Sequence, residues 1–130
     1  MRVSAGLCFQ GEKIWIFKRG AGRRNAHLWE FPGGKEEAGE MPTSCLVREL
    51  REELGLEVRD VQPVREADWE GIHFTFLTCE ALNAPACTEH EDCALVAPRE
   101  LLHYAFCPAD APVARALALN APPLTEFFWD

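Results

Sequence analysis

Acidic crowding between residues 33 and 58 constrains this chain more than any other feature of its sequence. The stretch reads GGKEEAGEMPTSCLVRELREELGLEV and sets seven glutamates against three basic residues. Carboxylates that lie three or four residues apart on a helix repel one another and destabilise it. The fold, or something bound to it, must therefore offset this repulsion.

The same stretch predicts an amphipathic helix over residues 42–54. Pro42 suits its first turn and Gly55 suits its end. Apolar residues recur at three- and four-residue steps, which predicts a buried stripe formed by Leu46, Val47, Leu50 and Leu54. Met41, just before the helix, has no side-chain oxygen for capping. We expect a neighbour to substitute for it: Glu40, or Thr43 and Ser44.

Three glutamates converge on the other side of this helix. Glu49 lies three residues from Glu52 and four from Glu53, whereas Arg48 offers one ion pair at four-residue spacing, to Glu52. One interpretation is a solvated acidic face. The other is a divalent-cation site, because Mg²⁺ and Mn²⁺ prefer clustered oxygen ligands completed by substrate phosphates. Helix spacing alone does not separate the two.

The flanking residues favour the cation site. From Gly34 the order is five residues, Glu40, seven residues, Arg48-Glu49, an aliphatic residue, any residue, Glu52-Glu53, any residue, Gly55 and an aliphatic residue. This pattern resembles the complete signature of the Nudix hydrolases, with every fixed position filled. LWEFPGGK upstream and FCPADAPV near the C-terminus resemble the MutT-type branch of that family, so the likeness covers nearly the whole chain.

The resemblance implies a role for each charged residue of the signature. Glu52 and Glu53 are expected as direct metal ligands, and Glu49 as a ligand or as the group that polarises the attacking water. The carbonyl of Gly34 is expected to complete the metal shell, while Arg48 orients the carboxylates and Glu40 braces the loop. The expected cofactor is Mg²⁺ or Mn²⁺, whose charge makes the carboxylate crowding favourable.

MutT-type relatives often take a further acidic ligand or base from a later loop. Here the candidate loop is TEHED, residues 88–92. Glu89 is the first choice and Glu91 the alternative. An acidic loop without a role is the competing interpretation for each.

The resemblance also implies a nucleotide pocket formed by Arg19, Glu30, Phe31 and Asp110. Arg19 matches a basic position that contacts nucleotide in the MutT-type branch, and Phe31 is expected at the pocket floor. Asp110 stands where 8-oxoguanine-specific bacterial enzymes carry asparagine; it resembles instead the cytidine-nucleotide pyrophosphohydrolases and some oxidised-purine hydrolases. Its carboxylate accepts from the exocyclic amine of cytosine. Each residue also has a purely structural interpretation. Arg19 could be a solvated residue at the end of a strand, Phe31 could belong to the core, and Asp110 could cap a helix.

Strand and helix patterns predict the fold class. Runs rich in β-branched and aromatic residues predict strands over 3–9, 13–19, 28–31, 72–82 and 93–97, the first two as a hairpin. A helical turn is expected at 98–102 and a second helix at 108–119. Mixed strands with two main helices indicate an α/β (α+β) sandwich. The resemblance specifies the Nudix α/β/α type with a mixed sheet, as one domain over residues 1–130; residues 56–64 and the tail 121–130 receive no assignment.

Charge and composition exclude several classes of function. A net charge of −8 disfavours a grip on long nucleic acid, and no apolar run approaches the roughly 20 residues of a membrane span. The sequence MRVSAGLCF lacks a signal-peptide pattern, and the six cysteines include no C-x-x-C pair. We therefore expect a cytoplasmic protein with reduced thiols, as a monomer or homodimer.

These observations predict a metal-dependent nucleoside triphosphate pyrophosphohydrolase. It would release a nucleoside monophosphate and pyrophosphate from oxidised, non-standard or cytidine-type nucleotides. Two alternatives remain open: hydrolysis of another nucleoside diphosphate derivative such as ADP-ribose, and a non-catalytic nucleotide-sensing Nudix domain. The short chain disfavours the first, and the retained Glu49, Glu52 and Glu53 disfavour the second.

Overall fold

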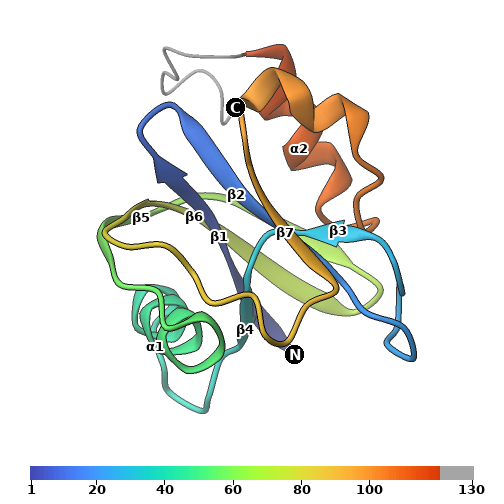
Figure 1. Ribbon diagram of the computed structural model, residues 1–130. Helices are drawn as coiled ribbons and strands as arrows, with labels where there is room; N and C mark the ends of the chain where they lie inside the picture. The colour runs from blue at the N-terminus through green and yellow to red at the C-terminus, as the bar shows by residue number, and fades with distance from the viewer. Residues whose placement is uncertain (121–130) are drawn as a thin grey trace.

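A mixed sheet with helices on both faces forms the framework of the molecule (Figure 1). The computed structural model describes residues 1–120. Its strands are β1 (Arg2–Gln10), β2 (Lys13–Lys18), β3 (Trp29–Glu30), β4 (Gly33–Lys35), β5 (Val58–Trp69), β6 (Ile72–Ala81) and β7 (Asp92–Val96). Helix α1 (Pro42–Leu54) covers one face, while the 3₁₀ helix η1 (Pro98–His103) and α2 (Ala111–Leu119) cover the other. The predicted α/β/α sandwich with two main helices is confirmed.

Strands β1 and β2 separate from each other beyond their turn, and this separation positions the site. The strand order is β3-β2-β1-β6-β5, with β4 added to β1 and β7 to β2; β1 and β6 are parallel, and the other pairs are antiparallel. In the described residues, β1 and β2 pair beside their turn, at Phe9 with Ile14 and Gln10 with Lys13. Beyond that point β1 pairs with β4, whereas β2 pairs with β3 and β7. The two strands therefore diverge.

Alternating side chains of the central strands build two cores. Leu7 of β1 packs on the α2 side, and its neighbour Cys8 packs on the α1 side, as the two-residue period of a strand requires. Helix α1 buries Leu46, Leu50 and Leu54 of its predicted stripe. Val47 is half-buried, and Cys45 takes the fourth buried position instead.

The helical predictions hold with two corrections. Helix α1 spans the predicted residues 42–54 and ends at Gly55, whose φ is 59°. Met41 is its N-cap without a side-chain cap, so the expected substitution by a neighbouring side chain is wrong. Helix α2 begins at Ala111 rather than at 108. Neither α1 nor α2 has the length and apolar character that a membrane-crossing helix requires.

Two strands, β4 and β5, were not predicted from the sequence. β5 contains Pro63 and many charged residues, which weaken a strand pattern. Proline is tolerated there because β5 lies at the edge of the sheet and its pairing with β6 shifts register on both sides of that proline. β4 covers the Gly33-Gly34 pair, and glycines are uncommon in strands. The tail, 121–130, lies outside the described residues.

Candidate active site

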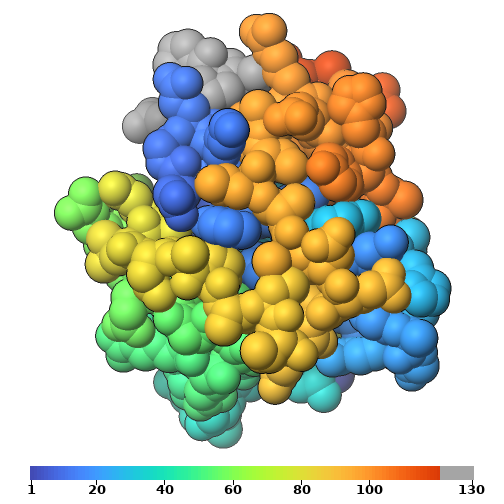
Figure 2. Space-filling model, in the orientation of Figure 1, coloured from blue at the N-terminus to red at the C-terminus, as the bar shows by residue number. Residues whose placement is uncertain are grey.

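A hollow of about 460 Å³ lies where β1 and β2 diverge. Its acidic end brings together four predicted metal-site residues: Gly34, Glu49, Glu53 and Glu89. They come from β4, from α1 and from the loop before β7. Figure 2 shows this last loop, in gold, between the green residues of α1 and the blue residues that follow β2.

Glycines of β4 let the helix approach the sheet. A Cβ atom at Gly34 would lie 2.4 Å from the carboxylate of Glu49, and one at Gly33 would lie 1.8 Å from the carbonyl oxygen of Ser4. Both distances are far below van der Waals contact, so no other residue fits either position without displacement of its neighbours. The two glycines therefore allow β4 to lie close to β1 and to the Glu49 side chain of α1.

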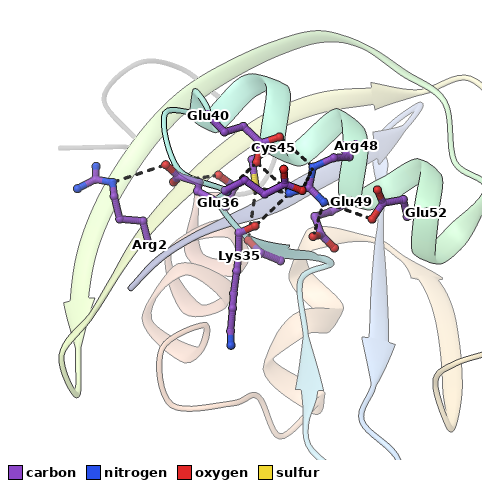
Figure 3. Close-up of polar contacts among 11 residues, drawn as sticks. Arg2, Lys35, Glu36, Glu40, Cys45, Arg48, Glu49 and Glu52 are labelled. Atoms are coloured by element: carbon purple, nitrogen blue, oxygen red, sulfur yellow. Dashed lines mark hydrogen bonds and ion pairs between the residues drawn. The ribbon is translucent and has the colours of Figure 1, made fainter.

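Arg48 organises the glutamates of the signature (Figure 3). Its guanidinium donates to both oxygens of Glu40, each at 2.9 Å, and to Glu49 Oε1 at 2.9 Å. It also donates to Glu52 Oε2 at 3.2 Å, which confirms the predicted ion pair, and to the carbonyl oxygen of Lys35 at 3.1 Å. This planar fork fixes the carboxylates relative to β4, as expected for an arginine in a bidentate pair.

Glu40 braces the loop before α1. Hydrogen bonds from Arg48 are the main reason that its pKa is lowered to about 2, and a hydrogen bond from the backbone N–H of Glu37 adds to them. The pKa of Arg48 is raised in return, chiefly by Glu40. Glu40 therefore remains an anion wherever the protein is folded near neutral pH.

Glu53 lies close to Glu49, and the two carboxyl groups affect each other's ionisation. Burial is the first cause that raises the pKa of Glu53 to about 7; a hydrogen bond with Glu49 and the charge of Glu49 add to it. Glu89 raises it further, while His90 opposes the shift. Three carboxylates thus line one hollow, one of them resists ionisation, and carboxylate oxygens are the ligands that a hard divalent cation prefers.

Glu52 is placed apart from the other predicted ligands. Its side chain is 60% exposed, pairs with Arg48 and lines a separate shallow hollow with Thr43 and Ser44. The structure therefore brings Glu49 and Glu53 together with Gly34 and Glu89, but not with Glu52. The predicted ligand role of Glu52 stays a prediction.

The loop before β7 separates its two acidic candidates. Glu89 lines the hollow. Glu91 turns outward and pairs with Lys18 Nζ at 3.1 Å and His27 Nδ1 at 2.7 Å; its pKa is lowered, first by Lys18. This geometry favours Glu89 as the additional acidic residue of the site.

The other end of the hollow contains the predicted nucleotide-binding residues Arg19, Glu30, Phe31 and Asp110. Arg19 Nη1 donates to Glu30 Oε1 at 2.7 Å, so this arginine is held by an ion pair and is not simply solvated. Burial disfavours the charge of Glu30, but hydrogen bonds from His90 and Arg19 outweigh it and lower the pKa of that carboxyl. Phe31 is buried and packs on Phe106 with ring centroids 5.2 Å apart, so it serves both the core and the hollow.

Asp110 occupies the N-cap position of α2 but makes no side-chain cap hydrogen bond. The capping interpretation is therefore wrong. Burial, followed by the charge of Glu30, raises the pKa of Asp110 well above its ordinary value. The base end of the hollow thus places a carboxyl whose pKa is lowered, Glu30, beside one whose pKa is raised, Asp110.

Two residues of this site escaped sequence analysis. His90 Nε2 lies 3.2 Å from Glu30 Oε2, and its Nδ1 is buried without a hydrogen-bond partner among the described residues. Cys107 Sγ lies within 4.8 Å of carboxylate oxygens of Glu30 and Asp110. The position of His90 directly after Glu89 was an available signal; nothing local marks Cys107, which reaches the site through tertiary contacts.

Comparisons with known proteins identify the family. Residues 1–121 match the family model described as the NUDIX domain. The chain is 39% identical to the CTP pyrophosphohydrolase of Escherichia coli K12 over 132 aligned positions, which cover 93% of this chain and 94% of that protein. It is also 39% identical to the 8-oxo-dGTP diphosphatase of Proteus vulgaris, over 45% of this chain and 53% of that protein.

Solved structures give the same assignment. A structure from a study of MutT from Aliivibrio salmonicida and Vibrio cholerae superposes with a TM-score of 0.81 at 31% identity, covering 92% of this chain and 99% of that one. The solution structure of the E. coli ORF135 protein superposes with a TM-score of 0.72 at 32% identity, covering 95% and 94%. The chain therefore belongs to the Nudix family, as a hydrolase that acts on pyrophosphate bonds.

Proposed function

We propose that this protein is a divalent-metal-dependent nucleoside triphosphate pyrophosphohydrolase of the cytoplasm. It cleaves between the α- and β-phosphates and releases a nucleoside monophosphate and pyrophosphate. The observation that carries the proposal is the single hollow with Glu49, Glu53 and Glu89 at one end and Arg19, Glu30 and Asp110 at the other. A phosphate chain requires cations, which the glutamates would hold, and a base requires hydrogen-bonding groups; this hollow contains residues for both.

The acidic end suits a pyrophosphate linkage. A divalent cation, Mg²⁺ or Mn²⁺, supplies charge that neutralises phosphate oxygens and lowers the pKa of a bound water. Glu49, Glu53, Glu89 and the carbonyl of Gly34 would hold it, with Glu52 as a further predicted ligand. Lys35 and Arg23 also line the hollow and form no ion pair among the described residues, so their charges are available to phosphates.

Arg48 keeps the catalytic carboxylates in place during the reaction. It donates a hydrogen bond to Oε1 of Glu49, which also shares a hydrogen bond with Glu53, so this carboxylate is held at the wall of the hollow where it would orient the attacking water. Because Arg48 is itself held by both oxygens of Glu40, it is a fixed donor, and rotation of the Glu49 carboxylate would break its charge-assisted bond with that donor. Such fixed orientation lowers the entropic cost of attack.

The base end supports cytidine-type and oxidised nucleotides as the two candidate substrate groups. Glu30 accepts hydrogen bonds from an exocyclic amine, whereas Asp110 accepts them as a carboxylate and donates one when it is protonated. The 39% identity to a CTP pyrophosphohydrolase over most of both chains favours the cytidine group. The matches to 8-oxo-dGTP diphosphatases, over less than half of this chain, support the second group.

The decisive experiment measures products as well as rate. CTP, dCTP, 8-oxo-dGTP and ADP-ribose are incubated with the protein in Mg²⁺, in Mn²⁺ and in EDTA, and phosphorus NMR identifies the products. We expect pyrophosphate and a monophosphate from a triphosphate, with metal only. Orthophosphate release, preferential cleavage of ADP-ribose, or nucleotide binding without turnover would each contradict the proposal.

A further inference from the structure

A thiol and two carboxyl groups gather beside the base end of the active-site hollow. Sγ of Cys107 and one carboxylate oxygen each of Glu30 and Asp110 all lie within 4.8 Å of one another. In residues 1–120, no other histidine, cysteine, aspartate or glutamate side chains bring three potential ligand atoms this close together. Cys107 and Asp110 are buried and Glu30 is half-buried, so this group is not an ordinary solvated acidic surface. We call these three residues the thiol cluster.

Backbone hydrogen bonds fix the thiol cluster. The N–H of Cys107 donates to the carbonyl oxygen of Trp29 at 2.8 Å, which holds the cysteine beside the residue that precedes Glu30. The N–H groups of Asp110 and Ala111 both donate to the carbonyl oxygen of Cys107, at 3.0 and 2.9 Å, so residues 107–111 form a tight turn. Cys107 and Asp110 thus have the Cys-x-x-ligand spacing at which cysteine pairs hold zinc in structural sites.

A histidine beside the thiol cluster is an additional potential ligand. Nε2 of His90 lies 3.2 Å from Oε2 of Glu30, and the His90 side chain is only 8% exposed. Among the described residues, its Nδ1 is the one buried side-chain nitrogen or oxygen that has no hydrogen-bond partner. A buried polar atom without a partner is costly, and a bound ion or water is a common reason for one. This observation is independent of the carboxyl groups, and it also points to a ligand at this end of the hollow.

The electrostatic potential at the Cys107 thiol favours a cation. Burial is the first cause that raises the pKa of this thiol to about 12, and the charges of Asp110 and Glu30 each add more than Arg19 removes. Arg19 therefore leaves the negative potential of the carboxyl groups incompletely neutralised, although its Nη1 lies 2.7 Å from Oε1 of Glu30. A divalent cation would offset this potential and would take the place of the thiol proton.

The thiol cluster lies where two hollows meet. Glu30 and Asp110 line the active-site hollow, and all three residues of the cluster line a second hollow of about 180 Å³. A single water needs about 15 Å³ of such volume, so a hydrated ion has room to approach the cluster through the second hollow.

We propose that Glu30, Cys107 and Asp110 form a binding site for Zn²⁺, with His90 or a water molecule as the fourth ligand. Tetrahedral Zn²⁺ has bonds of about 2.0 Å to oxygen or nitrogen and about 2.3 Å to sulfur, so its ligand atoms lie roughly 3.3–3.8 Å apart. Side-chain movements of about 1 Å bring atoms that already lie within 4.8 Å of one another to these distances. Binding releases the Cys107 thiol proton to solvent and transfers no electrons.

The zinc site differs in chemistry from the acidic end of the hollow. Glutamate and carbonyl oxygens at that end suit Mg²⁺ or Mn²⁺, whereas a thiolate with carboxylate and imidazole ligands suits Zn²⁺. The effect of zinc on activity rests on the proposed function, because that function assigns Glu30 and Asp110 to the nucleobase. Zn²⁺ on these two carboxylates blocks their hydrogen bonds to a base, so we expect it to inhibit in competition with the nucleotide.

Cobalt substitution tests the zinc site without reference to activity. Co²⁺ occupies zinc sites of the same geometry, and a cysteine ligand gives it a sulfur-to-metal charge-transfer absorption in the near ultraviolet. In excess Mg²⁺, which occupies the acidic end, we expect this absorption when wild type is titrated with Co²⁺, and its loss when Zn²⁺ is added. It should be absent from Cys107→Ser and present in the matched control Cys87→Ser, whose half-buried cysteine lines neither hollow. Absence from wild type, persistence in Cys107→Ser, or loss in Cys87→Ser would each overturn the proposal.

Zinc affinity provides a second measurement that keeps the thiol in place. Competition with a fluorescent chelator should show that Asp110→Asn binds Zn²⁺ about tenfold or more weakly than wild type, and Cys107→Ser about 100-fold or more weakly, since even the loss of an outer partner costs about 10- to 100-fold. Unchanged affinity in both variants would overturn the proposal.

Inhibition kinetics separate this inference from the proposed function. In excess Mg²⁺, Zn²⁺ should raise the KM for CTP and leave kcat unchanged, and Cys107→Ser should require about 100-fold more zinc for the same effect. Inhibition that added Mg²⁺ relieves and added CTP does not would place the zinc at the acidic end and overturn the inference. Absence of turnover on every triphosphate would refute the proposed function, and the cobalt absorption would still decide the zinc site.

Discussion

Replacement of Glu53 by glutamine is expected to stabilise the metal-free protein while it abolishes turnover. In the structure, burial and the neighbouring Glu49 raise the pKa of Glu53 from 4.5 to about 7. Ionised Glu53 therefore opposes folding. The difference corresponds to about 3 kcal/mol at 1.36 kcal/mol per pH unit, and because the side chain is only half-buried, solvent screening reduces it to roughly 1.5 kcal/mol.

The sign follows from which state binds the proton more tightly. The folded protein holds the Glu53 proton at a higher pH than the unfolded chain does. The destabilisation is therefore absent below about pH 4, grows between about pH 4.5 and 7, and is complete above pH 7. Glu53→Gln removes it, so at pH 8 in EDTA we expect a Tm increase of about 5 °C and none at pH 4.

Thermal unfolding with and without Mn²⁺ is the assay, combined with pyrophosphate release. Metal should raise the Tm of wild type by mass action and raise that of the variant much less. Glu57→Gln, whose exposed carboxylate pairs with Arg51, is the matched control and should leave both measurements nearly unchanged. A lower Tm of Glu53→Gln than of wild type in EDTA at pH 8 would refute the repulsion between Glu53 and Glu49. Near-full turnover by the variant would refute the role of Glu53 in catalysis.

Three further substitutions test other parts of the structure. Arg48→Lys keeps the charge but loses the planar guanidinium that holds Glu40 and Glu49. We therefore expect kcat to fall about 10- to 100-fold, the usual effect when a residue that orients metal ligands is replaced. The control variant Arg51→Lys should keep the wild-type kcat. Asp110→Asn replaces a group that can ionise with an amide that always donates, so the ratio of CTP to 8-oxo-dGTP turnover should change more than the rate on the poorer substrate; an unchanged ratio would remove Asp110 from base recognition. Leu50→Ala leaves a cavity under α1 and should lower the free energy of unfolding by about 2–5 kcal/mol in urea titrations, whereas a cost below about 1 kcal/mol would contradict its complete burial.

Local features of the chain were readable without a structure. Helix α1 was predicted residue for residue, because Pro42, Gly55 and the apolar spacing act within one or two turns of the backbone. The ion pair between Arg48 and Glu52 was equally accessible, since four-residue spacing places both on one face. The signature also predicted the family, because its charged residues lie within one loop and one helix.

Tertiary contacts decided which of these charges share a site. Glu52 and Glu53 are neighbours in sequence, yet helix geometry turns one toward Arg48 and the other toward the hollow, where burial raises its pKa. Glu89 and Glu91 look alike in the sequence; Lys18 and His27, both distant along the chain, hold Glu91 outside. Spacing along the chain determines which side chains share a face, but burial and distant partners determine their protonation.

The nucleotide-binding residues show the same contrast between what sequence predicts and what tertiary contacts decide. Sequence alone singled out Asp110 as a candidate for either capping or base recognition. The fold removed the first role by leaving its carboxyl without a cap bond, buried beside Glu30 and at the wall of a second hollow. The sequence thus determined the chemistry available to this protein, whereas the tertiary structure decided its arrangement, because long-range packing sets the solvation and neighbours of each ionisable group.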